Sequence, residues 1–220
     1  MTDAEDESNA FSEYGTLAHS ILEEWADGFL TAEELPLEYE RRYGSVVTSW
    51  FPPFPKGYAQ KAYDQGLDYF RGFNGFGEGL EIVSAEKKYI TKIGQYTFSG
   101  IVDLVLKDKE GNFIVYDHKT KSAASMKKEM DLYRRQLYIY ARFVYEEFGV
   151  FPKTIGFNMI KTNEVIQETF NKEKYDETMA WVEQTIDSIL MENEWGTCKS
   201  DYFCKFICGL MGHCPEWNFE

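Results

Sequence analysis

The chain lacks several features that mark common classes of protein. Its 220 residues contain no apolar run long enough to span a bilayer, and the acidic start over residues 1–7 is unlike a secretory signal. There is no internal repeat. The glycine-rich run over residues 72–79 is not followed by the GK[ST] signature of a phosphate-binding loop. We therefore expect an intracellular protein that makes no use of a membrane.

Positive charge is also scarce. Lys and Arg number 23 against 37 Asp and Glu, so the formal net charge is -14, which is unfavourable for binding a polyanion. The acidic excess lies mainly in residues 3–40 and 164–194. One segment is locally basic, with Lys119, Lys121, Lys127, Lys128, Arg134 and Arg135. Such a run is usually a solvated face, but beside an acidic site it can guide a polyanion toward that site.

Cysteine is absent before residue 198. The last 23 residues then hold all four cysteines, which are Cys198, Cys204, Cys208 and Cys214. In a reducing compartment, grouped thiols indicate a bound metal or cluster more often than disulfides. The alternative is a structural set of free thiols.

The remaining composition fits one α/β domain. A chain of this length with 44% hydrophobic residues can bury a sizeable core. We expect a loose acidic N-terminus over residues 1–12, a folded domain over 13–194 and a Cys-rich tail over 195–220 packed on that domain. Helices are predicted over residues 15–29, 56–73, 126–148 and 172–191, and strands over 80–90, 98–106, 113–116, 154–161 and 165–170.

The strands over 98–106 and 113–116 flank a turn-forming segment over residues 108–112, which predicts a β-hairpin. If the hairpin is symmetric about Glu110, Asp103 and Asp117 lie opposite each other, about 5 Å apart at Cβ, and Lys119 shares their face. Two carboxylates so close repel unless a cation lies between them, and Mg²⁺ prefers oxygen ligands. The alternative is that both aspartates are solvated positions at strand ends.

Two helices contribute further candidates. His19 borders the apolar face of the helix over 15–29, where a lone histidine is usually structural. In the helix over 126–148, Gln136 and Tyr140 share a face near Arg134 and Arg135, a combination suited to a phosphate backbone or a stacked base. The alternative is a buried Tyr140 that packs against Leu137.

Four motifs in this order resemble the PD-(D/E)XK nuclease superfamily, and more narrowly its RecB-type branch of phage and bacterial recombination exonucleases. They are GxxxH at Gly15 to His19, GxxD at Gly100 to Asp103, DxK at Asp117 to Lys119 and QxxxY at Gln136 to Tyr140. The resemblance implies a restriction-endonuclease-like core, in which a central mixed sheet is flanked by helices in an αβββαβ-type order.

The resemblance also implies roles for these residues. His19, Asp103 and Asp117 would bind Mg²⁺ or Mn²⁺, with Glu86 as a further acidic ligand. Lys119 would act on the attacking water. DNA would contact Gln136, Tyr140, Arg134, Arg135 and Lys121. Some relatives hold an iron-sulfur cluster on one upstream cysteine and three C-terminal ones. This chain departs from that pattern, so its cysteines are candidates for [4Fe-4S] or Zn²⁺.

The resulting expectation is a Mg²⁺-dependent DNA nuclease, more specifically an exonuclease of recombination, repair or phage DNA processing in the cytoplasm of a bacterial or phage-infected cell. A helicase or a single-strand annealing protein is the expected partner. Two alternatives remain open at this stage. One is a noncatalytic nucleic-acid-binding or assembly subunit that keeps the nuclease fold, and the other is an acidic metal-binding protein unrelated to DNA.

Overall fold

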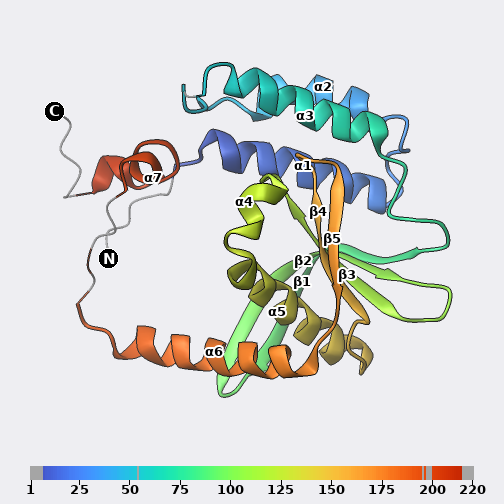
Figure 1. Cartoon of the computed structure of the whole chain (residues 1–220), viewed down its shortest axis with the longest axis vertical. Helices are drawn as coiled ribbons and strands as arrows, with labels where there is room; N and C mark the ends of the chain where they lie inside the picture. Colours follow the sequence, from blue (N-terminus) through green and yellow to red (C-terminus); the bar gives the residue numbers. More distant parts are fainter. Residues whose placement is uncertain (1–6, 54, 195, 197–199, 215–220) are drawn as a thin grey trace.

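A five-stranded mixed sheet forms the centre of the fold, with α5 and α6 on one side and α1, α2 and α3 on the other (Figure 1). The computed structural model describes residues 7–53, 55–194, 196 and 200–214. The strands are β1 (Glu81–Ile93), β2 (Tyr96–Lys107), β3 (Phe113–Lys119), β4 (Thr154–Met159) and β5 (Glu164–Thr169). The helices are α1 (Ala10–Ala26), α2 (Leu35–Val46), α3 (Tyr58–Gly72), α4 (Ala123–Lys127), α5 (Met130–Phe148), α6 (Lys172–Met191), α7 (Asp201–Phe206) and the 3₁₀ helix η1 (Met211–His213).

The strands lie in the sheet in the order in which they occur in the chain. All neighbouring strands are antiparallel except β3 and β4, which are parallel. Parallel neighbours require a long crossover, and α4 with α5 provides it. The α/β class and the mixed sheet flanked by helices are therefore as the sequence predicted.

Several element boundaries differ from the predicted ones. The first helix begins at Ala10, inside the segment 1–12 that we expected to be loose, because the Asn9 side chain accepts hydrogen bonds from the backbone N–H groups of Phe11 and Ser12. The helix predicted over 126–148 is divided into α4 and α5, because Glu129 leaves helical geometry at φ -125° and ψ 22°. Helix α2 was not predicted.

Among the described residues, two large hydrophobic clusters hold these layers together, beside a smaller one of Leu104, Leu106 and Tyr116. One lies between the sheet and α5, with Val115, Ile155 and Phe157 facing Leu137 and Val144. The second joins the three N-terminal helices and includes the buried side chains Leu17, Ile21, Leu35, Tyr39 and Phe70. Burial of this kind is the main stabilising contribution to such a fold. None of the helices in the described part of the chain has the length and apolar character needed to cross a membrane.

Candidate metal centre

Strand register lines up three carboxylates on adjacent strands. The β1–β2 pairs Ala85–Leu104 and Lys87–Val102 lie on either side of Glu86 and Asp103, so these two residues are opposite each other. The β2–β3 pairing runs from Lys107–Phe113 to Leu104–Tyr116, and continuing the same register sets Asp103 opposite Asp117. The hairpin is thus symmetric about Glu110, as the sequence predicted.

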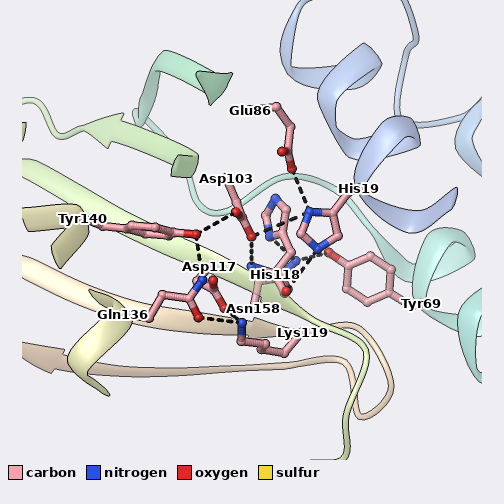
Figure 2. A network of polar contacts seen from close by, with 10 residues as sticks. All are labelled: His19, Tyr69, Glu86, Asp103, Asp117, His118, Lys119, Gln136, Tyr140 and Asn158. Carbon is pink, nitrogen blue, oxygen red and sulfur yellow. Dashed lines mark hydrogen bonds and ion pairs between the residues drawn. The ribbon is translucent and has the colours of Figure 1, made fainter. Parts of the chain in front are cut away.

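The backbone is irregular where this row crosses β1. Glu86 has φ 42°, a left-handed conformation that a non-glycine residue rarely adopts. Backbone strain of this kind is found mainly where the surrounding structure must aim a side chain. Here it accompanies a carboxylate directed at a histidine from another layer of the fold (Figure 2).

His19 reaches the carboxylates from α1. Its Nδ1 lies 2.7 Å from Oε1 of Glu86 and 3.7 Å from Oδ2 of Asp103. Its Nε2 lies 3.1 Å from the carbonyl oxygen of His118. A carbonyl only accepts hydrogen bonds, so Nε2 carries a proton and Nδ1 is the atom that can bind a cation. Ligand atoms of His19, Glu86 and Asp103 all lie within 4.8 Å of one another, so one metal ion could contact all three.

Lys119 and two side chains of α5 form a continuous chain of polar contacts from Asp117 to Asp103 (Figure 2). The Nζ of Lys119 lies 2.6 Å from Oδ2 of Asp117 and donates to Oε1 of Gln136 at 2.9 Å. The Nε2 of Gln136 donates to the hydroxyl of Tyr140 at 2.8 Å, and that hydroxyl donates to Oδ1 of Asp103 at 3.2 Å. Lys119 therefore lies on the same side of the sheet as both aspartates.

Burial makes this group of charges unfavourable without a cation. Burial, and then the negative charge of Asp117, raise the pKa of Asp103 to about 7. Burial also raises the pKa of Asp117, which is 1% exposed, although the charge of Lys119 opposes the rise. For His19, burial lowers the pKa, but the hydrogen bond to Glu86 and the charges of Asp103 and Glu86 outweigh it and raise the value overall.

The donor set fits an oxygen-preferring divalent cation. Oδ1 of Asp117 is buried and has no hydrogen-bond partner within the described part of the chain. Leaving such an atom unsatisfied is costly unless a cation or water binds it. Carboxylates with one histidine form a hard ligand set of the type that Mg²⁺ or Mn²⁺ accepts. His19, Glu86 and Asp103 would hold the ion, and Asp117 lies opposite Asp103 on the next strand.

A buried layer behind the ligands was missed by the sequence analysis. The backbone N–H of His118 donates to Oδ2 of Asp103 at 2.7 Å, while its carbonyl accepts from His19. The Nδ2 of Asn158 lies 3.1 Å from Nδ1 of His118 and donates to the hydroxyl of Tyr69 at 2.7 Å. Burial lowers the pKa of His118 well below its usual value, so its ring is neutral and its Nδ1 accepts. The one feature of the sequence that could have indicated this layer is the presence of His118 and Asn158 inside largely apolar strands.

Four of the five residues predicted to contact DNA fall into two groups, and the fifth, Lys121, donates to the hydroxyl of Tyr133. Gln136 and Tyr140 face the carboxylates, and although Tyr140 is buried beside the α5 core, its hydroxyl belongs to the polar network. Arg134 instead pairs with Glu168 of β5 and Asp131, and Arg135 lies 4.0 Å above the ring of Trp181 on α6. The structure does not bring these two arginines to the carboxylates.

The cysteine prediction falls partly outside the described residues, because Cys198 is not among them. Cys204, Cys208 and Cys214 are partly buried in and after α7. Among the described residues, no cysteine belongs to a group of three or more side chains close enough to share an ion. A zinc or iron-sulfur site on the four cysteines stays a prediction.

The family model described as the PD-(D/E)XK nuclease superfamily matches residues 2–215 of the chain. No match was found among curated proteins. A solved structure titled "Crystal structure of SSO0001" is similar over 99% of this chain and 90% of its own, with 15% sequence identity and a TM-score of 0.40.

Proposed function

The chain belongs to the PD-(D/E)XK nuclease superfamily, and from this membership we propose that it is a Mg²⁺-dependent deoxyribonuclease that acts as an exonuclease. The observation that carries the proposal is the group of His19, Glu86 and Asp103 within 4.8 Å, next to the ion pair of Asp117 and Lys119. Acidic ligands and a histidine can hold a divalent ion that activates water, and a nearby ammonium group can offset charge on a phosphate, so together they can hydrolyse a phosphodiester.

In this proposal His19, Asp103, Asp117 and Glu86 are the metal ligands. A divalent ion bound there supplies a water of lowered pKa and offsets negative charge on the phosphate. Lys119 orients or deprotonates the attacking water, or balances charge that develops on the phosphate. Its ammonium is held by Gln136 as well as by Asp117, so two contacts fix its position beside the carboxylates.

Gln136 and Tyr140 are proposed to position the DNA strand at the metal. Both side chains already join Lys119 to Asp103 through hydrogen bonds, so a phosphate that enters the site meets a polar surface with fixed donors. We further propose the RecB-type branch, a role in recombination, repair or phage DNA processing, a helicase or annealing-protein partner and a cytoplasmic location. The branch, the role and the partner rest on the resemblance that the four motifs carry.

A DNA digestion experiment tests the proposal. End-labelled linear DNA and covalently closed circles are incubated with the protein in Mg²⁺ and, separately, in EDTA. An exonuclease shortens linear DNA from its ends in Mg²⁺ and leaves circles intact. Nicked or linearised circles would indicate an endonuclease and overturn the exonuclease assignment. The absence of cleavage with Mg²⁺ and with Mn²⁺ would overturn the enzyme assignment.

Variants assign the activity to this site. Asp117→Asn and Lys119→Gln should each reduce the cleavage rate at least about a hundredfold, because each removes a charge that acts at the reacting phosphate. Asp68→Asn is the matched control, since Asp68 is an exposed aspartate on α3. It should cleave like the unmodified protein. A purified, folded Asp117→Asn protein with full activity would remove Asp117 from the site.

A further inference from the structure

A groove of about 800 Å³ lies at the N-terminal end of α1. Its walls come from the start of α1 and of α3, the residues that follow β3, and α7. Figure 1 shows α7 beside the beginning of α1. Hydrogen bonds fix the two together, since Nδ2 of Asn9 donates to the carbonyl of Ile207 and the N–H of Glu7 donates to the carbonyl of Gly209. We call this feature the α1–α7 groove.

The α1–α7 groove is positively charged in a strongly acidic protein. Lys61, Lys121 and Lys161 line it, and none of the lining residues that the structure describes is Asp or Glu, although the chain has 37 acidic residues. Within the described ranges, none of these three lysines forms an ion pair with a carboxylate. Their charge is therefore available to an anionic ligand.

The groove also has aromatic walls. Phe203 and Tyr202 of α7 are 48% and 50% exposed, and both line the groove together with Tyr58. Lys161 lies 4.6 Å from the ring centroid of Tyr58 and donates to its hydroxyl at 2.7 Å. Lysines that bind phosphates beside aromatic rings that stack on bases are the usual combination in proteins that bind single-stranded nucleic acid.

The volume suits a short stretch of a single strand. Sites of roughly 300–1,000 Å³ hold ligands of the size of a drug molecule. The α1–α7 groove lies in this range, which matches a few nucleotides of one strand with its bases free to stack on the aromatic walls. Hydroxyl and amide side chains suited to phosphate and sugar contacts also line it, including Ser12, Thr120 and Ser122.

Three chain segments lead from the groove directly into the carboxylate site. Thr120 and Lys121 follow Lys119 on the same strand end. Ser12 lies seven residues before His19 on α1, which is about 10 Å along the helix. The N–H of Ile160 donates to the carbonyl of Lys119 at 3.0 Å, and this pairing brings the next residue, Lys161, beside the site.

We propose that the α1–α7 groove binds a single-stranded segment of the DNA strand that is cut, with its phosphates on Lys61, Lys121 and Lys161 and its bases against Phe203. This inference rests on the proposed nuclease function and adds the substrate class, a strand with a single-stranded end. It also assigns a role to the Cys-rich tail, because α7 forms one wall.

Binding is tested on the full chain in EDTA, where no cleavage can occur. Fluorescence anisotropy of a labelled oligothymidylate gives the Kd at several salt concentrations. Lys61→Glu should raise the Kd at least tenfold, and the neutral variant Lys61→Gln should lower the slope of log Kd against log salt by about 0.7, as expected for one lost phosphate contact to a single strand. Phe203→Ala should raise the Kd roughly fivefold or more through lost stacking.

Matched controls lie on other faces. Lys88→Glu changes an exposed lysine on β1, and Phe29→Ala removes a ring that is 77% exposed after α1. Both should bind within twofold of the unmodified protein. The groove assignment is overturned if Lys61→Glu, Lys61→Gln and Phe203→Ala all bind normally, or if the controls lose as much affinity. Circular dichroism of each variant verifies that it is folded.

The outcome separates this inference from the proposed function. If the groove variants lose single-strand binding and the unmodified protein shows no cleavage with Mg²⁺ or Mn²⁺, the groove stands and the nuclease proposal fails. If the protein cleaves DNA but the groove variants bind single strands normally, the nuclease stands and the groove assignment fails.

Discussion

Replacing Asp103 by Asn should stabilise the metal-free protein while removing its response to metal. The pKa of this carboxyl rises from 3.8 to about 7 on folding, because burial and then the charge of Asp117 disfavour the ionised form. The folded state therefore holds a proton that the unfolded chain has released between these two pH values. By linkage, stability falls as pH rises from about 4 to about 7 and stays low above that range.

The size of the effect follows from the shift. About three pKa units at about 1.4 kcal/mol each give roughly 4 kcal/mol at pH 8. At pH 5, which is only about 1 unit above the pKa of Asp103 in the unfolded chain, this carboxyl lowers the unfolding free energy by less than about 2 kcal/mol. Asn carries no charge and does not titrate, so Asp103→Asn removes most of this cost. The figure is an upper limit, since the amide replaces an oxygen that accepts from Tyr140.

Differential scanning calorimetry in EDTA at pH 5 and pH 8 measures the difference. For a chain of this length about 1 kcal/mol corresponds to 2–4 °C, so Asp103→Asn should raise the Tm by up to roughly 8–16 °C at pH 8 and by less than half of that at pH 5. Saturating Mg²⁺ should raise the Tm of the unmodified protein and leave the variant nearly unchanged. The control Asp68→Asn should match the unmodified protein in both measurements, with an unchanged Tm in EDTA and the same rise of Tm in Mg²⁺. A variant that is less stable at pH 8, or an equal gain at both pH values, would refute the reasoning.

Three further predictions follow from the same structure. Gly66→Ala should reduce the unfolding free energy measured in urea by about 1–3 kcal/mol, since a Cβ there would lie 2.3 Å from the Tyr39 hydroxyl. The control Gly44→Ala lies in open space on α2 and should add up to about 1 kcal/mol to the unfolding free energy. Equal effects of the two substitutions would contradict the close packing at Gly66. Glu86→Gln should weaken Mg²⁺ binding about tenfold in isothermal titration calorimetry, and unchanged affinity would remove Glu86 from the ligand set. The Kd for Mg²⁺ should fall as pH rises through about 7 and level off above 8, because the ion displaces a proton from Asp103. A Kd that does not change between pH 6 and 8 would contradict the raised pKa of Asp103.

The local part of the site could be predicted from the sequence. The turn-forming segment and the period-two alternation fix the register of the β2–β3 hairpin, and with it the opposition of Asp103 and Asp117. Helix α6 begins at Lys172 and ends at Met191, as predicted, since its apolar repeat is continuous and Asn171 caps it. Both features depend on residues close in sequence.

Features that depend on distant segments could not be predicted in this way. Arg135 lies away from the carboxylates because its guanidinium makes a cation–π contact with Trp181 of α6, which is 46 positions later in the chain. The layer of His118, Asn158 and Tyr69 joins three separate elements, so no spacing in the sequence reveals it. The α1–α7 groove likewise forms only when the two ends of the described chain meet.

The strands lie in the sheet in the order in which they are synthesised, and this affects how the chain can fold during translation. Each new strand adds to the edge left by the one before it, so a chain emerging from the ribosome can extend its sheet stepwise without waiting for later segments. By the time β3 has been synthesised, His19, Glu86, Asp103 and Asp117 are all present. Cellular metal could thus stabilise a nascent intermediate before the crossover helix, the last two strands and the tail exist.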